Sequence, residues 1–103
     1  MNLISTAGQG LFAVNVFTVR PENQRPLIDC IRSAGDPARI PGLLSVHLLR
    51  SLDGTQVINH MHWAGEDAFR RATRENPMIA ATREKVGRLV EGAAPNLYEI
   101  VEL

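Results

Sequence analysis

Apolar residues follow one another in short blocks along the chain, and their spacing changes from block to block. Residues 11–19 hold β-branched and aromatic side chains on both faces of an extended chain, which indicates a strand covered on two sides. A helix is predicted from Pro21 to about Gly35, because proline suits a first helical turn and glycine a helix end. Its apolar residues recur at helical spacing: Leu27, Ile28, Ile31 and Ala34. Pro26 falls inside this helix, and we expect it near the first turn or at a local kink.

The middle of the chain predicts a β-hairpin. Residues 43–50 and 55–63 form two apolar-rich blocks, and the Asp53-Gly54 pair between them is typical of a tight turn. We therefore expect two antiparallel strands here.

Two helical segments and a last strand complete the pattern. A short helix is predicted over residues 65–74, and Asn76-Pro77 interrupts it, because the residue before a proline avoids helical geometry. A second helix is predicted over residues 77–91. Its inner face is formed at helical spacing by Met78, Ile79, Thr82, Val86, Leu89 and Val90. Residues 97–103 are predicted as the closing strand.

This order defines a ferredoxin-like βαββαβ domain of the α+β class, an antiparallel four-stranded sheet with its helices on one face. The strand at residues 43–50 is nevertheless apolar on both sides. One side has Leu44, Val46 and Leu48, and the other has Leu43 and Leu49. An apolar sheet face left in water forms a large sticky patch, so we expect a second copy of the chain to pack on it as a symmetric homodimer.

Length, charge and cysteine content narrow the class of protein. The 103 residues suit one domain, predicted over residues 11–103 after a loose tail at residues 1–10. Lysine and arginine total 11, as do aspartate and glutamate, and this balance gives no bulk field for nucleic acid or an anionic membrane. The start of the chain has no basic region and no long apolar core, so neither a signal peptide nor a membrane anchor is expected. Cys30 has no partner for an internal disulfide, is expected to be a buried thiol, and fits a reduced cytoplasm.

Alternation along residues 56–63 separates two sets of side chains. Val57, Asn59, Met61 and Trp63 share one face of the strand, and Gln56, Ile58, His60 and His62 share the other. If the first face turns towards the helices, an amide and an indole N–H line the same buried cavity. Asn15 lies among apolar neighbours in the first strand and would add a second amide, and buried amides need hydrogen-bond partners. The sequence thus predicts an apolar pocket with a few polar groups.

Arg83 lies at the edge of the apolar stripe of the last helix. A guanidinium there is able to face the pocket and to stabilise a phenolate, enolate or peroxide anion. Ordinary structural roles stay open at this point. The alternatives are that Trp63 fills the core, that the two asparagines satisfy backbone groups, and that Arg83 extends to solvent.

Three histidines, His47, His60 and His62, look at first like a metal set. Alternation places His60 and His62 on the face opposite Trp63, where a dimer contact is expected, and no carboxylate or cysteine lies at convincing spacing. No metal site is therefore predicted. The chain also has no glycine-rich phosphate loop and no dinucleotide fingerprint, so no flavin or nicotinamide cofactor is expected.

The stretch Asn59-His60-Met61-His62-Trp63 resembles the antibiotic biosynthesis monooxygenase family. The likeness covers nearly all of the chain after residue 10. Its most specific part is the combination of Ser-Leu-Asp-Gly at residues 51–54 with Asn-x-x-x-Trp at residues 59–63. The resemblance implies a dimeric α+β barrel, in agreement with the expected pairing of sheet faces.

The resemblance also implies roles for particular residues. In polyketide-oxidising members, an asparagine of the first strand, an asparagine and a tryptophan of the third strand, and a helical arginine line the pocket. These roles fall on Asn15, Asn59, Trp63 and Arg83, with Met61, Phe69, Thr82 and His47 as further substrate-binding candidates.

The chain departs from some members of this family. Some carry a tyrosine where this chain has Phe69, so a phenolic acid or base is absent there. Some carry a histidine where it has Leu49, and His47 lies two residues earlier on the same strand face. Haem-degrading relatives use a helical histidine, and no histidine follows His62, which argues against haem ligation.

The function expected from this resemblance is a cofactor-independent monooxygenase that oxidises an anthrone-like or phenolic polyketide with O2 to a quinone. The delocalised anion of such a substrate is able to pass an electron to O2, so the substrate itself supplies the reducing power. No general base stands out in the sequence. Three other readings stay open: a quinol monooxygenase of general metabolism, a non-oxidative polyketide isomerase or cyclase, and a dimeric binding module.

Overall fold

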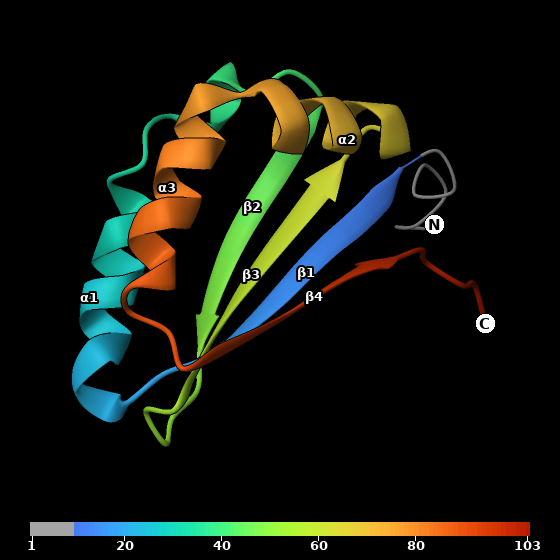
Figure 1. Ribbon diagram of the computed structural model, residues 1–103. Coiled ribbons are helices and arrows are strands. Elements are labelled where there is room, and N and C mark those ends of the chain that lie inside the picture. Colours follow the sequence, from blue (N-terminus) through green and yellow to red (C-terminus); the bar gives the residue numbers. More distant parts are fainter. Residues whose placement is uncertain (1–9) are drawn as a thin grey trace.

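The computed structural model describes residues 10–103, so most of the predicted tail at residues 1–10 lies outside the described residues (Figure 1). The elements in chain order are β1 (Leu11–Thr18), α1 (Pro21–Arg32), the short 3-10 helix η2 (Pro37–Arg39), β2 (Leu43–Arg50), β3 (Gln56–Trp63), α2 (Glu66–Glu75), α3 (Pro77–Gly87) and β4 (Gly92–Tyr98). None of the helices within residues 10–103 is long and apolar enough to cross a membrane.

Within the described residues the strands form one antiparallel sheet in the order β2-β3-β1-β4. The helices α1, α2 and α3 lie together on one side of this sheet (Figure 1). Since the two helices of a βαββαβ unit must bury their apolar stripes on the same face, this is the expected layering. The ferredoxin-like fold class is confirmed, with the second predicted helical region divided into α2 and α3 as the Asn76-Pro77 break predicts.

The register of the ladders decides which side chains meet the helices. Asn59 pairs with Asn15 of β1, and two residues further along β3 Met61 pairs with Ala13. Because side chains alternate along a strand, Trp63 lies on this same helix face of the sheet. The predicted face shared by Asn59, Met61 and Trp63 is therefore the one that the helices cover.

The opposite, open face of the sheet carries imidazole and aromatic rings. His62 stacks on Phe12 with ring centroids 4.4 Å apart, and His60 lies 5.0 Å from the same phenyl ring. His47 pairs with His60 across β2 and β3. His60 and His62 thus lie on the side away from Trp63, as the alternation predicts, and His47 lies on that side with them.

Two apolar clusters hold the layers together. The first contains the buried residues Phe17, Val19, Leu27, Val57 and Val86. The second contains Ala13, Ile40, Trp63 and Ala72. Full burial of one large apolar side chain contributes about 1.5–3 kcal/mol, so these clusters set the position of the helices on the sheet.

The turn between β2 and β3 is held by side chains. Asp53 Oδ1 accepts hydrogen bonds from the Ser51 hydroxyl at 2.7 Å, the Thr55 hydroxyl at 2.7 Å and the Thr55 N–H at 3.0 Å. Gly54 has φ of 83°, a left-handed conformation that favours glycine. The hydrogen bonds from Thr55, and then that from Ser51, lower the pKa of Asp53 to about 2, because they favour the charged carboxylate. The predicted Asp-Gly hairpin is present.

Helix α2 approaches the start of β2 closely. A Cβ atom at Gly42 would lie only 2.4 Å from the Cβ atom of Ala68, so glycine is needed at this contact. Gly42 also has φ of 84° and accepts a hydrogen bond from the N–H of Ala64 at 2.7 Å. The next helix, α3, begins where the Asn76 side chain accepts from the backbone N–H of Met78.

The end of the chain corrects the prediction. The last strand is Gly92–Tyr98, whereas apolar alternation predicted residues 97–103, and α3 ends at Gly87 rather than near Glu91. Glycine, alanine and proline have low strand propensity, but β1 offers a ladder that pairs with them from Thr18 to Phe12. Pro95 is tolerated because β4 is an edge strand.

A second correction concerns the start of β2. The register shifts between Leu43 and Ser45, so Leu43 lies opposite Trp63 and packs in the second cluster. Leu44 is 60% exposed instead of sharing the inner side with Val46. The bulge reverses the predicted sides of these two leucines.

Candidate active site

A cavity of about 760 Å³ lies between the helix face of the sheet and the helices. Residues from all the described strands, from α1, α2 and α3, and from the η2 region line it, and most of them are apolar. Seven of the predicted site residues are among them: Asn15, Asn59, Met61, Trp63, Phe69, Thr82 and Arg83. Ligand pockets of about 300–1,000 Å³ bury drug-sized molecules, so this cavity has room for a polycyclic one. The eighth candidate, His47, lies on the open face and does not line the cavity.

Two amides meet on the floor of the cavity. Asn15 and Asn59 are cross-strand partners in the centre of the sheet. The Oδ1 atom of each is buried, and neither has a hydrogen-bond partner within residues 10–103. No hydrogen bond of the described chain uses their amide nitrogens either. Side-chain amides carry two N–H donors and one carbonyl acceptor, so this pair is equipped to bind the oxygen functions of a ligand.

Trp63 lies deeper than a simple pocket-lining residue. Its side chain is 0% exposed, and its indole Nε1 has no hydrogen-bond partner among the described residues. The ring of Phe69 packs edge-on against it, with centroids 5.7 Å apart and an interplanar angle of 76°. A buried donor without an acceptor costs about 1–3 kcal/mol of stability. Packing of the fold alone therefore does not explain why an indole N–H occupies this position.

Arg83 connects the cavity wall to solvent. It lines the cavity from α3, and its Nη2 atom donates to the carbonyl of Thr73 at the end of α2 at 3.4 Å. The residue is exposed, so its guanidinium keeps its hydration on one side and the cavity on the other. The neighbouring Thr82 donates its hydroxyl to the carbonyl of Met78 at 2.8 Å, so that donor is used within α3.

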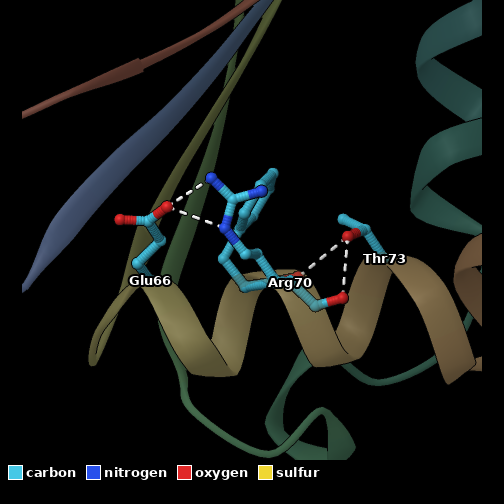
Figure 2. Close-up of polar contacts among 4 residues, drawn as sticks. Glu66, Arg70 and Thr73 are labelled. Atoms are coloured by element: carbon cyan, nitrogen blue, oxygen red, sulfur yellow. Dashed lines mark hydrogen bonds and ion pairs between the residues drawn. The ribbon is translucent and has the colours of Figure 1, made fainter.

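Helix α2 supplies the wall above Trp63. Arg70 forms an ion pair with Glu66 between two exposed side chains, and the Thr73 hydroxyl donates to the carbonyl of Phe69 at 3.0 Å (Figure 2). The helix therefore separates a charged outer face from an inner face that carries Phe69 and Thr73.

Several lining residues escape prediction from the sequence. Ala13 is buried on the floor beside Asn15, and Ala93 of β4 also lines the cavity, so small side chains keep the floor open. Thr73 faces the cavity from α2, and Asn96 borders it from β4. The signal for Ala13 was its place two residues before Asn15 in the first strand, because residues two apart share one face of a strand. Asn96 had no signal, since β4 was placed too late in the chain.

Arg83 is the one ionisable residue among the described residues that line this cavity. No carboxylate, imidazole, thiol or phenol borders it there, and no group of three or more potential metal ligands occurs within residues 10–103. The site can therefore donate hydrogen bonds and stabilise negative charge, but its own described side chains supply no evident base. A substrate in it has to be acidic in its own right.

The fold and the cavity define a small ferredoxin-like domain with a large, mostly apolar cavity between its sheet and its helices. A family model for antibiotic biosynthesis monooxygenases matches residues 10–85, and the chain belongs to this family. It is accordingly a monooxygenase. The resemblance read from the Asn-x-x-x-Trp segment is thus confirmed.

Three of the proteins that this chain resembles are oxygenases by name. The chain is 40% identical over 81 residues to the tetracenomycin-F1 monooxygenase of Streptomyces glaucescens, a match that covers 77% of this chain and 71% of that protein. The structure of SnoaB, a cofactor-independent oxygenase from Streptomyces nogalater, superposes with a TM-score of 0.75 at 26% identity, over 92% of this chain and 96% of that one. A monooxygenase from the gene ActVA-Orf6 of Streptomyces coelicolor, solved with the ligand nanaomycin D, gives a TM-score of 0.80 at 27% identity, over 91% of this chain and 89% of that one.

Proposed function

We propose that this protein oxidises an anthrone-like or phenolic polyketide with O2 to a quinone, without a flavin or a metal. The observation that carries the proposal is the cavity itself: two amides without a partner in the described chain and a guanidinium lie in a mostly apolar wall, with a fully buried indole N–H beside them. The names of two relatives support it, since one acts on tetracenomycin F1 and another is a cofactor-independent oxygenase.

The chemistry starts from the acidity of the substrate. An anthrone CH2 group loses a proton to give an anion delocalised over the rings. Arg83 is the only ionisable residue among the described lining residues. The proton therefore goes to water or to a substrate oxygen. Arg83 and the amide N–H groups of Asn15 and Asn59 would stabilise the negative oxygen of that anion. In a low-dielectric cavity such donors lower the free energy of the anion far more than they would in water.

Oxygen then reacts with the anion. One electron passes from the anion to O2, and the resulting radical pair combines to form a C–O bond, which gives a peroxide on the former CH2 carbon. Loss of the remaining hydrogen of that carbon, with cleavage of the O–O bond, releases water and leaves a carbonyl group. The balance is one CH2 and one O2 converted into one C=O and one H2O, so the substrate supplies all four electrons.

The proposal includes a homodimer formed through the open sheet face. Leu49 and Tyr98 on this face are 52% and 50% exposed, and His62 Nε2 is buried there without a partner in the described chain. A second copy would cover these side chains. Ile58→Glu, in the centre of this face, should give a monomer in sedimentation analysis, whereas a dimeric Ile58→Glu protein would contradict this part of the proposal.

The cavity favours oxygenation over a non-oxidative isomerase. An isomerase has to move a proton between two positions of its substrate and needs a group that accepts and returns it. The described lining offers the permanently charged Arg83 and no such group.

Oxygen consumption tests the proposal. Metal-stripped protein with no added flavin should consume O2 with a panel of anthrones and form the quinones in equal amounts, faster than the spontaneous reaction. Arg83→Ala should lose most of this rate, and Arg71→Ala, an exposed arginine of α2 outside the cavity, should keep it. No O2 consumption with any anthrone, by protein shown to be folded, would refute the proposed reaction.

A further inference from the structure

Phe69 and Trp63 meet at the wall of the cavity. Trp63 borders the cavity but is 0% exposed, so its indole N–H is shielded from solvent in this structure. Yet that N–H is also without an acceptor among residues 10–103. A buried donor without an acceptor in the described part of the chain is rare, and it points to a second arrangement in which an acceptor is present.

We propose that the ring of Phe69 is a gate over Trp63, closed in the empty protein and displaced when a flat aromatic ligand enters the cavity. The inference rests on the proposed function, because it assigns the incoming ring system to that substrate. In the open arrangement a substrate oxygen accepts a hydrogen bond from Trp63 Nε1. Phe69 is therefore a positioning residue, which acts on the substrate through Trp63.

The position of Phe69 suits this role. Its side chain is half-buried, lies on the cavity wall and contacts the indole edge-on at a centroid distance of 5.7 Å. A ligand ring that takes its place restores an aromatic contact with Trp63, so the exchange loses little packing energy. Aliphatic side chains packed against the same cluster, such as Ile79 and Leu43, offer no such exchange.

The ring rather than the helix is the part that moves. Helix α2 is fixed at its start by the close contact of Ala68 with Gly42. Ala72 is buried in the second cluster, and the carbonyl of Thr73 at the end of the helix accepts from Arg83. Rotation of Phe69 about its side-chain torsions leaves these contacts intact, whereas lifting α2 would break all of them.

The gate gives the site a selection step. A ligand that is too small or not flat leaves Phe69 in place, and the indole N–H stays shielded. Only a ring system wide enough to displace the phenyl group gains the hydrogen bond to Trp63. Substrate size is thereby linked to the alignment of the reacting oxygen.

The single tryptophan of the chain makes a direct test. In the 15N spectrum one indole N–H signal belongs to Trp63, and its hydrogen exchange reports whether the group is shielded. Phe69→Ala in the ligand-free protein should speed this exchange by about threefold to tenfold, in line with the loss of one aromatic pair, and Phe69→Tyr should keep it slow. Leu48→Ala, which packs against the other core cluster, is the matched control for general destabilisation and should leave the indole exchange unchanged once corrected for global unfolding.

Equal indole exchange in Phe69→Ala and wild type would overturn the gate. If Phe69→Ala does not fold, Phe69→Leu, which keeps the volume but removes the ring, makes the same comparison.

A ligand titration separates the gate from the proposed function. With 1,8-dihydroxyanthraquinone as an unreactive probe, the indole signal should move downfield together with the side-chain amide signals of Asn15 and Asn59. Shifts of the amides with a static indole signal would refute the gate and leave the pocket assignment in place. If no signal shifts, the proposed substrate class fails, and the exchange rates of the ligand-free variants still decide the gate.

Discussion

Asn15 and Asn59 face each other across β1 and β3, and the carbonyl oxygen of each amide is buried without a partner in the described chain. Two unsatisfied buried amides side by side lower the stability of the fold. Such groups persist where a ligand, rather than the protein, completes their hydrogen bonds. The two amides therefore lower stability but serve ligand binding. Replacing one of them with an apolar residue should raise the stability of the fold and lower the turnover of the substrate.

Asn59→Leu tests this opposition, since leucine has nearly the shape of asparagine but no polar atoms. The melting temperature should stay the same or rise, because an unsatisfied buried polar group is removed. Turnover of an anthrone should fall by about tenfold to a hundredfold, because one anion-stabilising donor is lost. Thermal unfolding and O2 consumption on the same preparation measure both. A less stable variant with normal turnover would show that Asn59 serves the fold and not the substrate.

Ala13 controls the room above the amide pair. It is 5% exposed and lies opposite Met61 in the centre of the cavity floor. Ala13→Leu should fill part of the cavity, raise KM for a tricyclic anthrone and affect a single-ring hydroquinone much less. Ala64→Leu, at an exposed position after β3, is the control and should leave both KM values unchanged. Equal KM changes for the two substrates would mean that the floor does not limit ligand size.

Arg83 should act through its charge. Arg83→Ala is expected to lower kcat by about a hundredfold to a thousandfold, the usual range for loss of a group that stabilises a developing oxyanion. Arg83→Lys keeps the charge and should recover part of the rate. Raising the pH in the Arg83→Ala protein should also recover rate, because solvent then deprotonates more of the substrate. An Arg83→Ala rate that does not depend on pH would argue against anion stabilisation by this residue.

Asp53 makes the stability of the hairpin depend on pH. Its pKa falls from 3.8 to about 2 on folding, so the folded state favours the carboxylate. That stabilisation is complete above pH 4, declines as the pH falls from about 4 towards 2, and is absent below the folded pKa. Wild type should therefore be more stable than Asp53→Asn at pH 7, and the difference should vanish near pH 2.

Carboxyl NMR titration checks the cause of that pKa. Thr55→Val removes the largest contribution, the hydroxyl hydrogen bond, and should move the pKa of Asp53 back towards 3.8. An unchanged pKa in Thr55→Val would assign the effect to other groups.

The sequence was sufficient to predict the hairpin and its inner face, because side-chain alternation and turn chemistry agree there. The period of two along β3 placed Asn59, Met61 and Trp63 on one face, and the Asp53-Gly54 turn predicted that β2 pairs with β3, where Leu48 lies opposite Asn59. Because one face of this strand is apolar and covered by helices, a slip of one residue would bury His60 and expose Trp63. The inner side of the sheet was therefore predictable.

The remaining features depend on tertiary contacts. The strand at Gly92–Tyr98 has little propensity of its own and forms because β1 offers a ladder, and the bulge at Leu43 has no local signature. The complete burial of Trp63 under Phe69 is set by where α2 packs, which the close contact of Ala68 with Gly42 decides. Spacing along the chain does not encode such contacts.

Oxygen labelling tests the central proposal most directly. A single turnover of metal-stripped protein with an anthrone under 18O2, in ordinary water and without added flavin, should place one labelled oxygen atom in the new carbonyl group and the other in water. This result is expected because the peroxide forms on the substrate carbon and loses its outer oxygen. A new carbonyl oxygen that comes from the solvent, measured before exchange sets in, would contradict oxygenation in this cavity.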